Sequence, residues 1–262
     1  MPELSKPLQT RLRRIQTALG VRADGVLGPE TLSALEAQLE IRAAPSATSL
    51  ECSASGLALI VEFEVSSKTY YEKRLKSPIW PGEQSGVTIG IGYDLGMTKR
   101  EQIESDWGGR IPDVDLVALL AVQGVTGKAA KTLAEGLSHI SIPYTVAESA
   151  FYQSTLPHHA RLTRDTYPGV EKLPADAQAM LLSLIYNRGT SLDKKNDRRR
   201  EMAAIKPLVK KGAAALAGIA QQVESMARLW PTSSGLRDRR RREANAIRDA
   251  KRIYDPAELV RL

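Results

Sequence analysis

The stretch that most constrains the fold is residues 56–96, where an apolar helical stripe ends in a carboxylate and a glycine-rich segment follows. Leu57, Ile60 and Val61 recur at helical spacing, and Glu64 continues the same stripe. An unpaired charge that faces a core is costly, and burial raises the pKa of a carboxyl group. The pattern therefore makes Glu64 a candidate general acid. The alternative is a helix-end residue whose carboxylate reaches water.

Two extended segments joined by a long loop are expected after this helix. Residues 69–75 are rich in tyrosine and predict a strand. Residues 77–86 contain the proline and glycine residues of a turn-rich connection. Residues 87–93 then alternate between apolar and small or polar side chains, which predicts a second strand.

One face of the second strand consists of small and polar residues, namely Thr88, Gly90, Gly92 and Asp94. Glycine in a strand often marks the close approach of a ligand or of another backbone. We interpret this face as the floor of a cleft, with Glu64 at the end of the helix above it. A tightly packed strand that binds nothing is the alternative.

This order of elements resembles the phage-type lysozymes, which are family 24 glycoside hydrolases that act on peptidoglycan. In that family a catalytic Glu ends the first helix, the pattern Glu-x8-Asp-x5-Thr follows, and the Thr opens a Thr-Ile-Gly-x-Gly-His signature. Glu64 and Thr88 match the Glu and the Thr, and Tyr93 stands where the His usually is. The resemblance implies a small β-hairpin lobe and a larger helical lobe, with Gly90, Gly92 and Tyr93 lining the substrate cleft.

The second carboxylate of the family has no direct counterpart. The family spacing would place it at Lys73, and Glu72 is one residue short. Asp94 is the other candidate, because it shares a strand face with Thr88. We prefer Asp94 for the role and keep Glu72 as the alternative.

The C-terminal half is predicted to be helical and to contain the core. Residues 175–187 form its most hydrophobic helical pattern and end in Asn187-Arg188-Gly189, which resembles the end of the long buried helix of the phage-type lysozymes. That resemblance makes Asn187 a candidate substrate-binding residue. Trp230 and the Gly-Leu-x-x-Arg-Arg motif at 235–240 resemble the closing segment of the family.

The N-terminus carries a separate motif, in which Leu8-Gln9-x-x-Leu12 precedes a turn-rich Asp-Gly-x-x-Gly-x-x-Thr segment. The motif resembles the peptidoglycan-binding type 1 domains, and its candidate wall-binding residues are Asp24, Gly25, Gly28 and Thr31. Turn geometry is the alternative role of the two glycines. Residues 42–52 are rich in Ala, Ser, Thr and Pro without periodicity and predict a linker.

The expected fold class is therefore α+β and mostly helical. Residues 1–41 form a small helical module, residues 42–52 form the linker, and residues 53–262 form a lysozyme-like catalytic domain. The single cysteine, Cys52, excludes an intrachain disulfide framework. His158 and His159 lack a third ligand at metal spacing, so we expect no metal, and no organic cofactor is needed.

The formal net charge of +7 is compatible with several polyanionic partners. We expect peptidoglycan as the partner of a monomeric protein, and contact of the arginine-rich segment 236–254 with an anionic envelope. Nucleic-acid binding is not expected, because that segment lacks supporting aromatic residues. The N-terminus lacks the apolar region of a signal peptide. We therefore expect a protein made in the cytoplasm that reaches the periplasmic wall after release or delivery by another machine.

The function implied by the resemblance is hydrolysis of the β-1,4 bond between N-acetylmuramic acid and N-acetylglucosamine, by a phage endolysin or an antibacterial effector. Glu64 would protonate the leaving oxygen, Asp94 or Glu72 would activate water, and Thr88 would hold that water. A lytic transglycosylase would need only Glu64. A non-catalytic wall-binding or structural protein would leave Glu64 idle.

Overall fold

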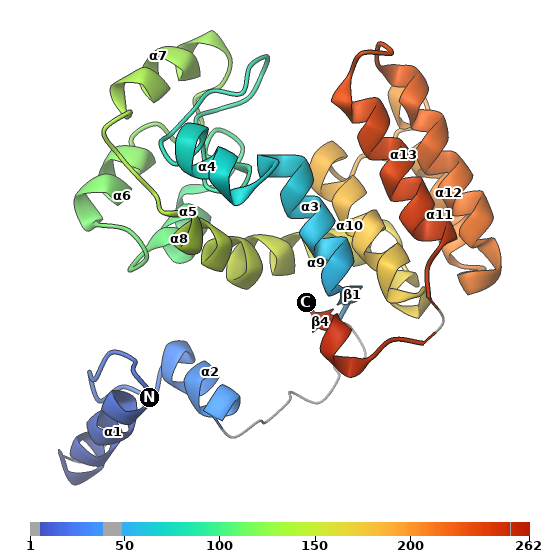
Figure 1. Cartoon of the computed structure of the whole chain (residues 1–262). Helices are drawn as coiled ribbons and strands as arrows, with labels where there is room; N and C mark the ends of the chain where they lie inside the picture. The colour runs from blue at the N-terminus through green and yellow to red at the C-terminus, as the bar shows by residue number, and fades with distance from the viewer. Residues whose placement is uncertain (1–5, 39–48, 252) are drawn as a thin grey trace. The chain divides into compact units, whose positions relative to one another are not determined.

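The structure, a computed structural model, describes residues 6–38, 49–251 and 253–262. The chain forms two compact units, Met1–Thr48 and Ser49–Leu262 (Figure 1). The described residues are mostly helical, with two small antiparallel sheets, and this confirms the expected mostly helical α+β class.

The first unit contains helix α1 (Lys6–Ala18) and helix α2 (Pro29–Gln38). The apolar side chains of α1 are only partly buried. Leu12 is buried, but Leu8 and Ile15 are 48% and 43% exposed. The other buried residue of α1 is a polar one, Gln16, whose amide organises the following loop.

The second unit begins with strand β1 (Glu51–Ser53), which pairs antiparallel with the C-terminal strand β4 (Leu259–Arg261). Cys52 lies opposite Val260 in this sheet. Residues 49–52, which the sequence assigns to the linker, therefore belong to the second unit. A pairing across the whole length of the domain has no local signal in the sequence, which is why it was not predicted.

The first lobe of the second unit follows helix α3 (Ala54–Val65). Its elements are α4 (Lys68–Arg74), β2 (Thr88–Ile89), β3 (Tyr93–Asp94), α5 (Arg100–Trp107), α6 (Asp113–Leu120), α7 (Lys128–Gly136) and α8 (Tyr144–Ala150). The predicted strand at 69–75 is wrong, because α4 is a helix. The Ser67 hydroxyl caps it by accepting from the Tyr70 N–H, and Lys73 and Arg74 complement its C-terminus.

The predicted strand at 87–93 is instead a tight hairpin. Thr88 pairs with Asp94 and Ile89 pairs with Tyr93, and the chain reverses between them. Gly90 and Gly92 permit this reversal with φ values of +56° and +67°, a region that other residues rarely adopt.

Helix α8 continues through a single π-helical turn (Phe151–Thr155) into helix α9 (Leu156–Thr166). The π-turn ends two residues before Pro157, which lacks the N–H of a regular α-helical ladder. In Figure 1 this long helix passes from the first lobe toward the second.

The second lobe is built around helix α10 (Ala175–Arg188), of which residues 177–185 are all buried. The predicted core helix is thereby confirmed. Helices α11 (Arg200–Val209), α12 (Leu216–Ser225) and α13 (Gly235–Arg248) pack beside it. Short 3₁₀ turns lie at Val170–Lys172, Asp197–Arg199, Gly212–Ala215, Met226–Leu229 and Pro256–Glu258.

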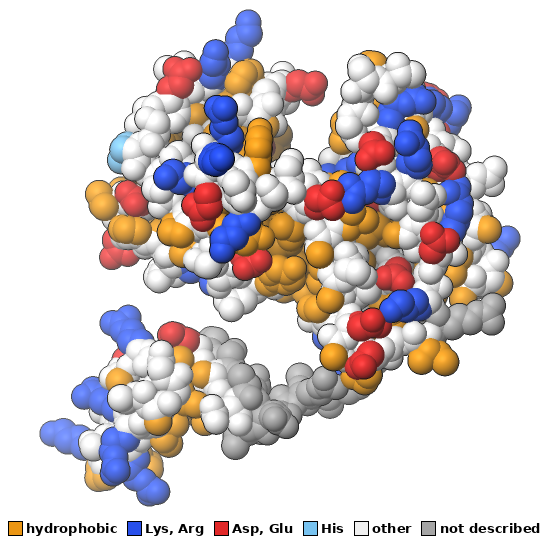
Figure 2. Space-filling view, in the orientation of Figure 1, with side chains coloured by type: hydrophobic (Ala, Val, Ile, Leu, Met, Phe, Trp, Pro, Cys, Tyr) orange, Lys and Arg blue, Asp and Glu red, His pale blue; other side chains and the backbone are white. Residues whose placement is uncertain are grey.

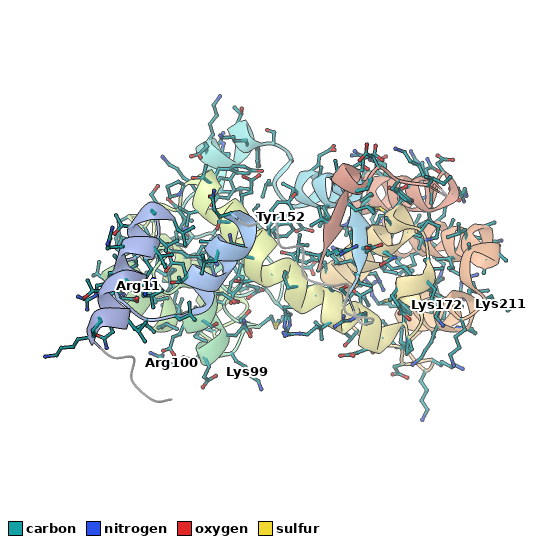
Figure 3. The ribbon with its side chains drawn as sticks, turned by 90° about the horizontal axis from the view of Figure 1, so that it is seen from below. Arg11, Lys99, Arg100, Tyr152, Lys172 and Lys211 are labelled. Atoms are coloured by element: carbon teal, nitrogen blue, oxygen red, sulfur yellow. The ribbon has the colours of Figure 1, made fainter. Side chains whose placement is uncertain are left out.

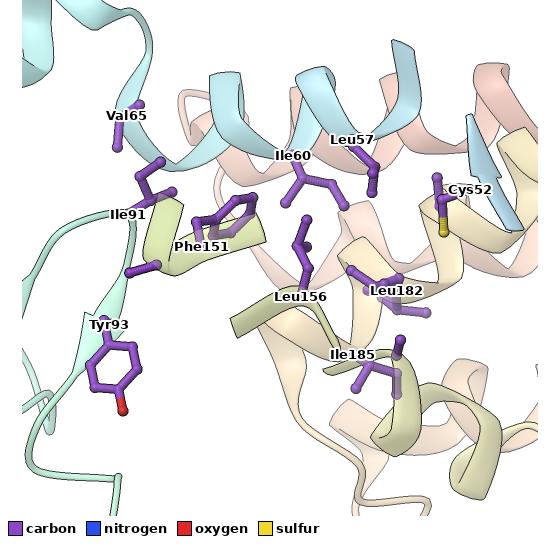
Figure 4. Close-up of a cluster of buried hydrophobic side chains, with 14 of the residues drawn as sticks. Cys52, Leu57, Ile60, Val65, Ile91, Tyr93, Phe151, Leu156, Leu182 and Ile185 are labelled. Carbon is purple, nitrogen blue, oxygen red and sulfur yellow. The ribbon is translucent and has the colours of Figure 1, made fainter. Parts of the chain in front are cut away.

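The two lobes share one apolar core beneath α3. Leu57 and Ile60 of α3 face Leu156 of α9 and Leu182 of α10, and Ile91 of the hairpin joins the same cluster (Figure 4). This packing fixes the end of α3, and therefore Glu64, against both the hairpin and the second lobe.

Candidate active site

Glu64 lies in the last turn of α3 and forms an ion pair with Arg239 of α13. The Arg239 guanidinium donates to Glu64 Oε1 at 2.7 Å, and the two side chains are 6% and 17% exposed. The sequence alone suggested an unpaired carboxylate, and the structure corrects this. The partner lies 175 positions away in the chain, so no local pattern could show it.

The hairpin contacts Glu64 through Gly92. A Cβ atom at Gly92 would lie 3.1 Å from Glu64 Oε2 and 2.8 Å from the Tyr186 hydroxyl oxygen. The glycine of the Thr-Ile-Gly-Ile-Gly segment therefore makes a close approach, and the group that it approaches is the candidate acid. Oε1 of Glu64 contacts Arg239, and Oε2 lies on the side of Gly92.

Tyr186 of α10 lies near enough for the charge of this carboxylate to act on its hydroxyl. Its hydroxyl donates to the Ile91 carbonyl at 2.7 Å and so ties the hairpin to the core helix. Burial and the negative charge of Glu64 raise the pKa of Tyr186 well above its usual value. Sequence reasoning missed Tyr186. Its position directly before Asn187, at the end of the core helix, is the only signal that could have indicated it.

His159 packs its ring 4.5 Å from the ring of Tyr186. Its Nδ1 lies 2.9 Å from the Thr155 carbonyl, so that nitrogen carries the proton. Burial lowers the pKa of His159 to about 4. His159 is thus a neutral packing residue behind the site near pH 7.

Arg239 is itself held by groups from α10 and α13. It donates to Glu243 at 3.1 Å and to the Ser183 hydroxyl at 3.1 Å. Ser183 donates to Glu243 at 2.6 Å. Burial acts to lower the pKa of Arg239, but the charges of Glu64 and Glu243 outweigh it and raise that pKa. The guanidinium stays charged and fixes the orientation of Glu64.

Asp94 lies opposite Thr88 across the hairpin, and not six residues further along one strand as predicted. Its carboxylate accepts from the backbone N–H groups of Gly86 at 3.0 Å, Gly96 at 2.8 Å and Met97 at 3.3 Å. Thr88 is 8% exposed, and its hydroxyl donates to the Gly86 carbonyl at 3.4 Å. Asp94 therefore shapes the loops at both ends of the hairpin.

Glu72, the alternative second carboxylate, lies on α4 and contacts α8. Its Oε1 accepts from the Tyr144 N–H at 2.9 Å, in the first turn of α8. A carboxylate at a helix N-terminus satisfies an otherwise unpaired donor and complements the helix dipole. Both candidates thus bind backbone N–H groups, and within the described ranges neither contacts Glu64.

The remaining candidate substrate residues have packing or surface positions. The Tyr93 hydroxyl donates to Asp106 at 2.7 Å, and its ring lies edge-on to Trp107 at 5.5 Å. A Cβ atom at Gly90 would lie 2.8 Å from the Trp107 ring. Asn187 is exposed at the end of α10. Of the predicted hairpin residues, only Gly92 touches Glu64.

A pocket of about 470 Å³ opens beside this site, between the end of α3 and the start of α13. Phe63 forms one wall, with the guanidinium groups of Arg239 and Arg242 at 4.9 Å and 5.1 Å from its ring centre. Figure 2 shows the second unit hollowed between its two lobes in this region. Arg239 lines the pocket and also binds Glu64, so a ligand in the pocket would be separated from the Glu64 carboxylate by the Arg239 side chain.

Residues 62–164 match a domain family of unknown function, DUF8812. No curated protein matches the chain. The matched segment runs from the end of α3 through the hairpin into α9, and it contains Glu64, Thr88 and Asp94. It ends before α10 and α13, which supply Tyr186 and Arg239.

The candidate wall-binding residues of the first unit form a hydrogen-bonded turn around Gln16. The Gln16 amide nitrogen donates to Asp24 and Thr31 at 2.9 Å each, and its oxygen accepts from the Gly25 N–H at 2.8 Å. Gly25 has φ +78°, and the Gly28 N–H donates to the Val26 carbonyl. These four residues therefore build the loop. The exposed residues of the loop include Asp24 and the apolar side chains of Val26 and Leu27.

Within residues 6–38, 49–251 and 253–262, no group of three metal-ligating side chains is present. In the same residues, no helix is long and apolar enough to cross a membrane. Exposed basic side chains occur on separate parts of the second unit, with Lys99 and Arg100 far from Lys172 and Lys211 in Figure 3.

Proposed function

We propose that the second unit is a peptidoglycan glycosidase, a muramidase in which Glu64 is the general acid. The observation that carries the proposal is the position of Glu64, nearly buried at the end of α3, held by Arg239 and pressed against Gly92 of the hairpin. The resemblance to the phage-type lysozymes supplies the substrate. A carboxylic acid is the group that glycoside hydrolysis requires beside the scissile bond.

In this mechanism Glu64 protonates the oxygen of the leaving N-acetylglucosamine. Its Oε1 accepts from Arg239, so Oε2 is the oxygen that carries the proton. The bond between the muramic C1 and that oxygen breaks toward an oxocarbenium-like state. Water then adds to C1 and gives up a proton to the Glu64 carboxylate, which is thereby protonated again. The product has a reducing muramic end.

A lytic transglycosylase is the second candidate function, and one observation favours it. Asp94 and Glu72 each bind backbone N–H groups, so Glu64 is the carboxylate that is left to act on substrate. In that reaction Glu64 first gives its proton to the leaving oxygen. It then takes a proton from the muramic 6-hydroxyl as that oxygen bonds to C1, and a 1,6-anhydro end forms.

Product analysis separates the two functions. Purified Gram-negative sacculi are digested with the full chain, the products are reduced with borohydride, and their masses are measured. Reduced muramic ends support the muramidase, and anhydro-muramic ends support the transglycosylase. The absence of released fragments would contradict both and would favour a wall-binding or structural role.

We also propose that the first unit binds the wall and that the basic surface of α13 contacts the anionic envelope. Delivery to the periplasm would then depend on a separate machine. Sedimentation of the full chain with sacculi tests the binding step. A Gln16→Ala variant, which breaks the turn at Asp24 and Gly25, should sediment less than the wild type if the first unit contributes.

A further inference from the structure

Three arginines gather near the C-terminus of α10 without an acidic partner. Arg188 ends α10, and Arg198 and Arg199 lie in the 3₁₀ turn before α11. Among the residues that the structure describes, none of the three forms a salt bridge. We refer to these residues as the arginine cluster.

The acids nearest in sequence are already paired with other arginines. Asp197 contacts Arg200 at 3.3 Å and Arg228 at 2.6 Å. Glu201 contacts the same two arginines at 3.1 Å and 2.7 Å. The charge of Glu201 still acts to raise the pKa of Arg188, but these acids are engaged by other arginines and form no salt bridge with the arginine cluster.

The cluster is held in place despite the repulsion between its members. The Trp230 ring lies 5.2 Å from the Arg188 guanidinium and 6.0 Å from that of Arg198. Arg188 donates to the Arg198 carbonyl, and Arg199 donates to the Arg188 carbonyl. These contacts use some of the guanidinium N–H groups and fix the others in position.

Several donors of this region have no partner in the described part of the chain. They are the Nε of Arg188 and the Nε and one terminal nitrogen of Arg240, a fully buried residue that pairs with Glu243. Burial first, and then the charges of Arg199, Arg240 and Arg198, lower the pKa of Arg188 to about 10. These nitrogens are buried, so an anion would relieve the repulsion from the side of the exposed Arg198 guanidinium.

We propose that the arginine cluster is a binding site for a phosphate-class oxyanion. Planar guanidinium groups bind phosphate oxygens in pairs, and a multiply charged anion matches several uncompensated arginines better than a single carboxylate does. Trp230 serves as the support of Arg188 and Arg198. The site is separate from Glu64 and requires no part of the proposed glycosidase activity.

The anion can come from a soluble phosphate compound or from a phospholipid headgroup, and the test distinguishes them. Binding of inorganic pyrophosphate to the full chain is measured by calorimetry at constant ionic strength. Binding to vesicles of phosphatidylglycerol and phosphatidylcholine is measured by sedimentation. Arg198→Gln is the test variant, because the Arg198 guanidinium contacts only the Trp230 ring among the described residues. Arg200→Gln is the matched control, since it removes the same charge from an arginine that already has acidic partners.

A weakening of pyrophosphate affinity by roughly tenfold in Arg198→Gln, with a change within about twofold in Arg200→Gln, supports the proposal with a soluble source. Binding to vesicles alone, with the same dependence on Arg198, supports it with a headgroup source. No binding of either probe would overturn it. An equal loss in both variants would also overturn it, because it would indicate only the net charge. Thermal unfolding of each variant establishes that the fold is intact.

Discussion

Glu64 and Asp94 are both carboxylates of the second unit, but their surroundings differ in kind. Glu64 contacts Arg239, which lies 175 positions away, and lies against Gly92 of the hairpin, which in turn lies against Tyr186 of the core helix. Asp94 accepts from backbone N–H groups that are two, three and eight positions away. The first carboxylate is placed where three distant elements meet, and the second organises its own loop. The proposed chemistry therefore depends on Glu64, and the contacts of Asp94 give it a role in local structure.

The largest effect on stability is expected from adding a side-chain atom at Gly92, where the hairpin lies close to Glu64. Gly92→Ala adds a Cβ atom 2.8 Å from the Tyr186 hydroxyl at a residue with φ +67°. We expect a loss of about 3 kcal/mol in the free energy of unfolding, from backbone strain and overpacking together. Urea denaturation of the full chain measures it.

Gly109→Ala is the matched control, because Gly109 has φ +73° and open space around a Cβ atom. It should show only the strain, about 1 kcal/mol. Equal losses in the two variants would mean that Gly92 does not press against Tyr186 and Glu64.

Asp94→Asn tests the other side of the comparison. The substitution weakens the acceptor of three backbone N–H groups, and we expect a loss of about 2 kcal/mol in the free energy of unfolding. The rate of sacculus digestion by the folded variant should stay within about tenfold of the wild type. A rate loss of roughly a hundredfold without a loss of stability would instead make Asp94 the second catalytic carboxylate.

Stability near the Glu64 site should depend on pH through His159. Its pKa is about 4 in the folded protein against 6.5 ordinarily, so the unfolded chain binds a proton between these values and the folded chain does not. The contribution of neutral His159 to the free energy of unfolding is therefore fully present above pH 6.5. It is lost as the pH falls toward 4, and the free energy of unfolding decreases by roughly 2–3 kcal/mol.

Urea denaturation at pH 7 and at pH 4.5 measures this dependence. His159→Gln should reduce the difference between the two values, and His139→Gln, which changes an exposed histidine, should not. An unchanged difference in His159→Gln would show that His159 is not held neutral behind Tyr186.

The smallest effect is expected at Glu72. Glu72→Gln keeps an acceptor for the Tyr144 N–H but removes the charge from the N-terminus of α8, so the free energy of unfolding should fall by about 0.5–1 kcal/mol. The digestion rate should not change. A rate loss of roughly a hundredfold would restore Glu72 as a catalytic candidate.

The sequence predicted the features that depend on local pattern. The α3 stripe and the core helix around Leu181 and Leu184 follow from periodicity, whereas Gly90 and Gly92, predicted to lie within one strand, form the turn of a hairpin. It failed at residues 69–75, where tyrosine content suggested a strand. The Ser67 cap and the packing of Tyr71 in the core instead make that segment a helix.

The parts of the site that were not predicted depend on long-range contacts. Arg239 belongs to a run of arginines whose members look equivalent in the sequence, yet Arg239 and Arg240 are buried while Arg241 is exposed. Only the packing of α13 against α10 determines which of them reaches Glu64. The pairing of β1 with β4 is non-local in the same sense.

The most direct test of the central claim compares two glutamates of α3. Glu64→Gln leaves an oxygen that can still accept from Arg239, and Glu62→Gln changes an exposed residue that pairs with Arg242. The release of soluble fragments from sacculi is followed for both variants, together with their unfolding. We predict a rate loss of roughly a hundredfold or more for Glu64→Gln with its fold intact, and near wild-type release for Glu62→Gln. A folded Glu64→Gln protein that digests sacculi at the wild-type rate would contradict the assignment of Glu64 as the acid.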